Sequence, residues 1–419
     1  MDTPTQVTSS VPADLPSTAL VDREQAEGYV AMICFKHGPP RLQGVELEWT
    51  VHHGNDLARA MDTSLLSRAL GPHAPPAISS YRAQQRLPQG SLITVEPGGQ
   101  VEISTPPNRS SADLISVATS DMATLAGRLD EHGLVLGHHG ADPHRRPNRL
   151  LKVPRYVAMQ AAFDRIGPHG SRMMCSTASI QICLDAGEAD QVVARWRAVH
   201  ALGPTLVALF ANSTHLDGRD TGWASSRLRA TLGTCPPFTL APEPSDDPAA
   251  QWARMAMEAP VICVRGDGPS WTAPPGLTFP AWIAEPARVG RPPTFDDLDY
   301  HLSTLFPPVR PKGYLEIRYL DAQPGTRWVA AFALISALMA RPSTVDQVLG
   351  LTEASQGRWL EAARDGLADP ALRAAARQVV QLGADSLDHL DLAAVQYRQV
   401  LGELALLAEA IPTSQRCPV

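Results

Sequence analysis

Lysine is scarce in this sequence of 419 residues. It occurs only as Lys36, Lys152 and Lys312, so arginine supplies 33 of the 36 basic residues. None of the three lysines follows a glycine. This excludes a Walker-type phosphate loop, because that loop places its lysine directly after a glycine. If the chain handles a nucleotide, it does so by another design.

Other common signatures are also missing. The chain has no G-x-G-x-x-G dinucleotide fingerprint, no G-x-S-x-G nucleophile elbow and no H-E-x-x-H zinc motif. Its six cysteines form no C-x-x-C pair, which favours reduced thiols over a zinc ribbon. The chemistry must therefore be sought elsewhere, in the polar residues of strands.

Long apolar runs are absent as well. The longest, residues 328–340, is 13 residues long, whereas a membrane-spanning helix needs about 20. The N-terminal residues are polar and lack the basic start and apolar core of a secretory signal. The net charge of −7 argues against a general nucleic-acid binder. We expect a cytoplasmic protein with neither a membrane nor a nucleic acid as partner; the sequence carries no signal for an oligomeric state.

The content of 44% hydrophobic and 19% charged residues is typical of a globular chain. We expect a flexible leader at residues 1–20 and a single catalytic domain over 21–419, of which 342–419 is a helical C-terminal extension. Helices are predicted over 55–70, 188–200 and 203–210 among others, and a short strand over 261–265. Strands interspersed with helices predict an α+β fold with a mostly antiparallel sheet.

Four extended segments alternate between apolar and polar side chains, at 42–51, 91–105, 176–185 and 313–320. Their polar sets are Glu46 with Glu48, Glu96 with Gln100 and Glu102, Gln181, and Glu316 with Arg318. Successive side chains of a strand point to opposite faces, so each set lies on one face. A solvent-facing side of an antiparallel sheet is the common explanation for one such pair. The four sets together contain five glutamates and only one arginine, and this bias favours a functional face over a solvent-facing one.

Carboxylates gathered on one sheet face repel and raise one another's pKa unless a divalent cation neutralises them. A ligand set of oxygen atoms alone suits Mg²⁺ or Mn²⁺ better than zinc. The sequence therefore predicts a concave sheet that binds two or more Mg²⁺ ions, with Mn²⁺ as the other candidate.

Several longer motifs then resemble a known family. They are GVELE at 44–48, VEPGGQVEIS at 95–104, CSTASIQICLD at 175–185, ALFANS at 208–213 with WASSRLR at 223–229, and HLSTLFPPVRPKGYLEIR at 301–318. In this order they resemble the glutamate-cysteine ligases of the plant and bacterial type, and within that family the actinobacterial enzymes of ergothioneine biosynthesis. The resemblance implies the catalytic fold of glutamine synthetase, in which a curved, mostly antiparallel sheet forms an active-site cradle.

The resemblance also implies roles for individual residues. The implied metal ligands are Glu46, Glu48, Glu96, Glu102, Gln181 and Glu316. Arg318 resembles the arginine that neutralises the transferred phosphoryl group and forms the predicted catalytic pair with Glu316, while the predicted ATP contacts are Gln181, Arg318 and Lys312. Arg227, Arg155 and Tyr156 match residues near the glutamate substrate. For Arg227 and Arg155, a surface or helix-capping arginine remains the alternative.

The implied reaction is the ATP-dependent ligation of L-glutamate to L-cysteine through γ-glutamyl phosphate. The alternatives are a ligase of the same fold with another amine acceptor, a phosphotransferase to a guanidino group, a metal-dependent hydrolase, and an inactive binder. Cys183 stands where related enzymes often carry Asn. Because its motif contains no neighbouring base, we expect a small core residue there. The motifs do not identify the residues that bind cysteine.

Overall fold

The main sheet of this computed structural model, which describes residues 18–79 and 83–412, is antiparallel throughout. Its six strands in that part of the chain lie in the order β3-β4-β1-β6-β10-β9. Their bounds are β1 (Gln43–Trp49), β3 (Leu92–Val95), β4 (Val101–Ser104), β6 (Ser179–Leu184), β9 (Val309–Pro311) and β10 (Leu315–Asp321). Two small pairs join β2 (Val51–His53) to β5 (Leu134–Leu136) and β7 (His215–Leu216) to β8 (Arg219–Asp220). The predicted α+β fold is confirmed.

One face of the sheet packs against α3 (Ser111–Asp130), α6 (Val192–Leu209) and α11 (Trp328–Leu338). Its apolar side chains, among them Val45, Leu47 and Ile182, are almost completely buried. Each such side chain stabilises the fold by about 1.5–3 kcal/mol. A slip of one residue would expose the whole set, so this layer fixes the strand register. The intervening polar side chains must therefore point to the opposite face.

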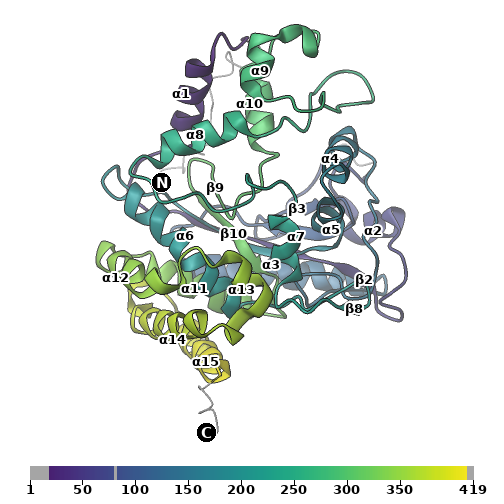
Figure 1. The fold of residues 1–419 in the computed structure, drawn as a ribbon. Helices are drawn as coiled ribbons and strands as arrows, with labels where there is room; N and C mark the ends of the chain where they lie inside the picture. The colour runs from purple at the N-terminus through teal and green to yellow at the C-terminus, as the bar shows by residue number, and fades with distance from the viewer. Residues whose placement is uncertain (1–17, 80–82, 413–419) are drawn as a thin grey trace, which may run out of the picture.

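Four helices, α1 (Arg23–Cys34), α8 (Pro248–Glu258), α9 (Phe279–Ala284) and α10 (Phe295–Leu302), gather at one end of the molecule (Figure 1). Asp22 caps α1 by accepting a hydrogen bond from the backbone N–H of Gln25 at 2.8 Å. Thr294 and Asp297 form a capping box at the start of α10. These signals are local, which explains why the start of α1 is predictable from sequence.

Three predicted elements differ from the structure. The helix expected over 55–70 is shorter, α2 (Thr63–Leu70), because Asp62 provides the N-cap. The two helices expected over 188–210 form one helix, α6, which continues through Pro204 while both its halves are buried. The predicted strand at 261–265 contributes only an isolated bridge from Cys263 to Thr272. A local cap decides the first case, and tertiary packing decides the other two.

The helices α12 (Pro342–Thr352), α13 (Trp359–Asp365), α14 (Pro370–Asp385) and α15 (Ala394–Ala410) lie at the other end of the molecule (Figure 1). Helices α12, α13 and α14 all pack on α6. The remaining α-helices are α4 (Pro154–Asp164), α5 (His169–Ser176) and α7 (Ser226–Leu232). Short 3₁₀ turns occur at η1 (Gly71–His73), η2 (Pro286–Arg288), η3 (Glu353–Ser355), η4 (Gly366–Ala368) and η5 (Leu387–His389).

The ends of the chain bear on the predicted domain boundaries. Residues 1–17 of the predicted leader and 413–419 of the predicted extension lie outside the described residues. At the leader's end, the backbone N–H of Leu20 donates to the carbonyl oxygen of Pro293 at 2.9 Å, and the Leu20 side chain is buried. The division into leader, catalytic domain and extension stays a prediction.

Within the described residues, no single helix has the length and apolar composition needed to cross a membrane. Helix α11 and the segment Pro342–Ser355 meet that requirement only together, as a pair bent by 107°.

Candidate active site

Rows of polar side chains cross neighbouring strands on the second face of the sheet. One row is Thr94, Glu102 and Glu48, the next is Ser104, Glu46 and Gln181, and the third is Cys183, Glu316 and Arg310. A register shift in β10 between Ile317 and Leu320 lies beside the second row. There the Arg318 guanidinium donates to the Gln181 side-chain oxygen at 2.5 Å. The strand register thus assembles the predicted residues from four separate strands.

A cavity of about 320 Å³ lies over this face, between the sheet, α4, α5, α7 and the loop 303–308. Every predicted site residue except Glu316 lines it, namely Glu46, Glu48, Glu96, Glu102, Arg155, Tyr156, Gln181, Arg227, Lys312 and Arg318. An apolar part of its lining is formed by Met159, Met173, Met174 and Phe306. The cavity therefore combines a charged floor with an apolar wall.

Glu316 lies beneath the cavity, fully buried, in a cluster of cations. Its carboxylate accepts hydrogen bonds from Arg310 at 2.6 Å, Arg318 at 2.7 Å and Lys312 at 3.0 Å. Burial opposes its ionisation, but Arg310, Arg318 and Lys312 outweigh that effect and hold the pKa of Glu316 below its usual range. Glu316 is therefore ionised and fixes the direction of Arg318. Arg310 was not among the residues predicted from the sequence. It lies two positions before Lys312, the spacing that places two side chains of a strand on the same face, and this was a usable signal.

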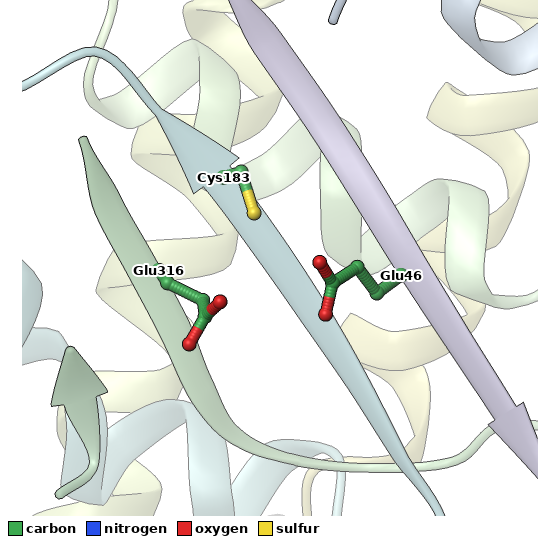
Figure 2. A group of neighbouring side chains, drawn as sticks. All are labelled: Glu46, Cys183 and Glu316. Atoms are coloured by element: carbon green, nitrogen blue, oxygen red, sulfur yellow. The ribbon is translucent and has the colours of Figure 1, made fainter. Parts of the chain in front are cut away.

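Cys183 points to the polar face rather than into the core. It lies between Glu46 and Glu316 (Figure 2), and the ligand atoms of all three residues lie within 4.8 Å of one another. Burial, followed by the charges of Glu46 and Glu316, raises the pKa of its thiol well above the usual value. Because only a thiolate is a strong nucleophile, Cys183 is unsuited to covalent catalysis. The expectation of a small core residue is wrong, because Cys183 lies two residues after Gln181 in β6 and alternation places both side chains on the polar face.

Three glutamates of the cavity hold their protons unusually strongly. Burial, together with repulsion from neighbouring carboxylates, raises the pKa of Glu46 to about 7, of Glu96 to about 8 and of Glu102 to about 7. The Glu102 carboxylate also accepts hydrogen bonds from the hydroxyls of Thr94 and Ser104, both at 2.9 Å. Mutual repulsion of this kind is relieved by a bound cation.

The donor chemistry of the cavity fits a divalent cation of the Mg²⁺ or Mn²⁺ type. Among the described residues, neither histidine nor cysteine lines it, so the available ligands are carboxylate and amide oxygens. Glu48 already accepts from the backbone N–H of Ser179 at 2.8 Å and from the Gln181 amide at 2.6 Å. These bonds orient Glu48 and turn the Gln181 oxygen toward Arg318.

Arg227, at the start of α7, is 5% exposed, which rules out the surface alternative. One of its terminal nitrogens donates to the carbonyl oxygen of Arg318. The other, Nη1, lies 3.8 Å from Oδ1 of Asp321 and has no hydrogen-bond partner among the described residues. Burial lowers the pKa of Arg227, and Asp321 opposes that shift. Its guanidinium is therefore poised for an anionic partner.

Asp321, which the sequence analysis missed, holds this region together. Its carboxylate accepts from the backbone N–H of Asn212 at 2.8 Å and from the hydroxyls of Ser213 and Ser225 at 2.7 and 2.8 Å. A Cβ at Gly140 would come within 2.7 Å of the Asp321 side chain, so only glycine fits there. The usable signal was an acidic residue directly after the strand predicted over 313–320, which carries Glu316 and Arg318.

Arg155 and Tyr156 lie in the first turn of α4. The Arg155 guanidinium donates to the hydroxyl and the carbonyl oxygen of Ser303 at 3.0 and 2.9 Å and packs over the Tyr300 ring at 5.0 Å. Burial and the nearby Glu96 raise the pKa of Tyr156, so its hydroxyl stays protonated. Arg155 therefore links α4 to the loop over the cavity.

Residues 42–411 match the family model described as Glutamate-cysteine ligase family 2. A similar protein, Glutamate--cysteine ligase EgtA of Mycolicibacterium smegmatis, is 38% identical over 373 residues, which cover 86% of this chain and 84% of that protein. EgtA of Mycobacterium tuberculosis is 37% identical over 388 residues, which cover 90% and 86%. The glutamate-cysteine ligase of Francisella tularensis, solved in complex with AMP, superposes with a TM-score of 0.51 at 12% identity, covering 90% of this chain and 82% of that one. This last likeness concerns the fold.

Proposed function

The chain belongs to glutamate-cysteine ligase family 2, and from this premise we infer that it joins L-glutamate to L-cysteine at the expense of ATP, giving γ-glutamylcysteine, ADP and phosphate. One observation links the inferred reaction to particular residues. Four glutamates of the sheet converge on one cavity beside the cation cluster of Arg310, Lys312 and Arg318. That arrangement suits a reaction in which a polyphosphate and a carboxylate must meet.

The metal ligands would be Glu46, Glu48, Glu96, Glu102 and Gln181, which hold two or more Mg²⁺ or Mn²⁺ ions. When bound, these ions neutralise charge on the phosphate oxygens and polarise the reacting phosphoryl group. Glu316 was also predicted to be a metal ligand, but it lies beneath the cavity and three cations hold its carboxylate, so we assign it a positioning role instead. It keeps Arg318 and Lys312 oriented toward the nucleotide.

In the first step, a γ-carboxylate oxygen of glutamate attacks the γ-phosphorus of ATP, and the bond from that phosphorus to the β–γ bridging oxygen breaks, so ADP departs. Arg318 and Lys312 neutralise the charge that moves onto the phosphate oxygens. Arg227 pairs with the α-carboxylate of glutamate and thereby presents the γ-carboxylate. Arg155 and Tyr156 complete the glutamate site.

In the second step, the neutral amine of cysteine attacks the carbonyl carbon of γ-glutamyl phosphate. The carbon–oxygen bond to phosphate breaks, phosphate leaves with the former carboxylate oxygen, and the ammonium proton passes to solvent. The protein contributes no covalent nucleophile, in agreement with the raised pKa of the Cys183 thiol. Positioning and charge neutralisation provide the catalysis.

Three wider features belong to the proposal. The enzyme works in the cytoplasm on small molecules, and neither a nucleic acid nor a membrane is expected as a partner. Residues 21–419 act as one catalytic domain with a helical extension after 342. The product serves ergothioneine biosynthesis, in line with the similarity to the EgtA proteins.

The test is phosphate release from ATP with each amino acid alone and with both together. We expect release only when glutamate and cysteine are both present with Mg²⁺. Release with glutamate and a different amine, but not with cysteine, would favour the related amine ligase. No consumption of ATP with any amino-acid pair would leave the hydrolase or inactive-binder alternatives.

A further inference from the structure

A second and larger cavity lies on the other side of α7. Its volume is about 900 Å³, and it shares no lining residue with the catalytic cavity. Helices α5, α6, α7 and α13 and the proline-rich loop 236–244 surround it. Three tryptophans, Trp196, Trp223 and Trp359, contribute to its lining. A cavity of this size with aromatic walls is typical of a site for a small organic ligand.

Arg229 is the unusual charge in this cavity. Its guanidinium packs over the Trp223 ring at 4.5 Å, is half-buried, and has no hydrogen bond or ion pair to any residue of the described chain. The carboxylates in the lining, Glu243 and Glu353, are exposed and form no ion pair with it within that same part of the chain. Arg197, the other arginine, already pairs with Asp246 at 2.7 Å. Among the described residues that line this cavity, Arg229 is therefore the one cation without a counterion.

Two histidines of the lining are uncharged and leave Arg229 as the group that an anionic ligand would pair with. His169 is neutral, because burial and the nearby Arg172 and Arg229 lower its pKa. His200 donates from Nδ1 to the carbonyl oxygen of Trp196 at 2.8 Å, and burial lowers its pKa to about 4. Neither imidazole ring is charged, so Arg229 is the group in the lining that would pair with an anion. The Arg229 guanidinium packs over the Trp223 ring, and its N–H groups, which are unpaired within the described chain, suit a bidentate bond to a carboxylate.

We propose that this cavity binds a small planar aromatic carboxylate. Its carboxylate group pairs with Arg229, and its aromatic ring packs against the three tryptophans of the lining. Aromatic rings gain packing energy against tryptophan, and a carboxylate matches the fork of a guanidinium. Neither interaction depends on the catalytic residues. The site is thus separate from the proposed ligase activity.

The cavity is connected to the catalytic site through α7 and β10. Helix α7 is seven residues long and carries Arg227 on the catalytic side and Arg229 on the second side. On the α13 side, Trp359 packs edge-on against Tyr319, which lines the catalytic cavity, at 5.4 Å. A Cβ at Gly203 would come within 1.9 Å of Trp359, so the ring is firmly seated. An occupant that moves Arg229 therefore changes the KM for glutamate.

The binding test uses the full-length enzyme and two matched probes, indole-3-acetate and its neutral amide, by isothermal titration. We expect one site for the carboxylate and at least about tenfold weaker binding of the amide, the loss that a charge-assisted hydrogen-bonded pair represents. Arg229→Gln should weaken binding of the carboxylate at least about tenfold, and Arg229→Lys should lose part of the affinity. Arg172→Gln, which removes a nearby cation outside the lining, is the control and should bind as the wild type does.

Equal binding of the two probes, no binding of indole-3-acetate, or full affinity in Arg229→Gln would each overturn the proposed site. Because the comparison of the two probes needs only wild-type protein, the result does not depend on the variants folding. For the connection through α7, we expect indole-3-acetate to change the KM for glutamate at least about fivefold, the lower end of the usual range of coupling free energies, in the wild type but not in Arg229→Gln. An unchanged KM at saturating probe would overturn that connection.

Discussion

Replacing Glu96 with glutamine should abolish turnover and yet stabilise the metal-free protein at alkaline pH. Burial and the repulsion of Glu102 and Glu48 raise the pKa of Glu96 from 4.5 to about 8. A carboxyl group with a raised pKa in the folded state destabilises the fold once the pH exceeds its unfolded pKa. This penalty grows between about pH 4.5 and 8 and is complete above the folded pKa. Glutamine carries no charge at any of these pH values.

The magnitude follows from the shift. At 1.36 kcal/mol per pKa unit, the ionised Glu96 costs the fold about 5 kcal/mol above pH 8. The buried amide of glutamine brings N–H groups that need acceptors, which costs about 1–3 kcal/mol. The net gain is about 2–4 kcal/mol above pH 8 and becomes a small loss at pH 5. For a chain of 419 residues this corresponds to a Tm shift of about 2–5 °C.

The assay is thermal unfolding in the presence of a chelator, at pH 5 and at pH 8. Glu188→Gln is the matched control, because Glu188 is exposed and forms no ion pair within the described residues; its Tm should follow that of the wild type at both pH values. Adding Mg²⁺ at pH 8 should reverse the order, since a metal that binds only the folded state stabilises the wild type more. If Glu96→Gln lowers the Tm by the same amount at both pH values, the acidic face is not under charge repulsion and the reasoning fails.

Three further predictions concern the cation cluster and its supports. Arg318→Lys should lower kcat at least about 100-fold with little change in the KM for glutamate, because charge stabilisation of the transition state is lost; steady-state kinetics with an unchanged kcat would contradict this role. Asp321→Asn keeps its size but loses the charge beside Arg227, so the KM for glutamate should rise about tenfold with kcat nearly unchanged, and a second substitution at Arg227 should then add little; additive effects would exclude coupling. Glu46→Gln and Glu316→Gln should both abolish turnover, but only Glu316→Gln should also destabilise the fold, by about 3–5 kcal/mol in chemical denaturation, because it leaves three cations without their anion.

The polar face of the sheet was predictable because its signals are local. Alternation places Glu46 and Glu48 on one face of β1, and the same rule applies to Glu102 in β4 and to Arg318 in β10. The motif order then identified the family without knowledge of the strand order. Caps that lie within four residues of a helix start, such as Asp22, belong to the same class of signal.

The rest depends on contacts between distant segments. The cluster of cations around Glu316 depends on the pairing of β10 with β9, which brings Arg310 opposite Glu316. Alternation places Cys183 on the same face as Gln181, but its position between Glu46 and Glu316 depends on the pairing of β6 with β1 and β10. Asp321 gains its role only when residues more than 90 positions away approach it. No periodicity in one segment reports such a contact.

In the proposed reaction, the γ-carboxylate of glutamate is phosphorylated before cysteine attacks it. Glutamate labelled with ¹⁸O in the γ-carboxylate, incubated with ATP, Mg²⁺ and cysteine and followed by mass analysis of both products, tests this order of steps. We expect γ-glutamylcysteine and inorganic phosphate that carries one ¹⁸O atom from glutamate. Unlabelled phosphate released together with the dipeptide would show that the acyl phosphate is not formed, and would contradict the mechanism assigned to this site.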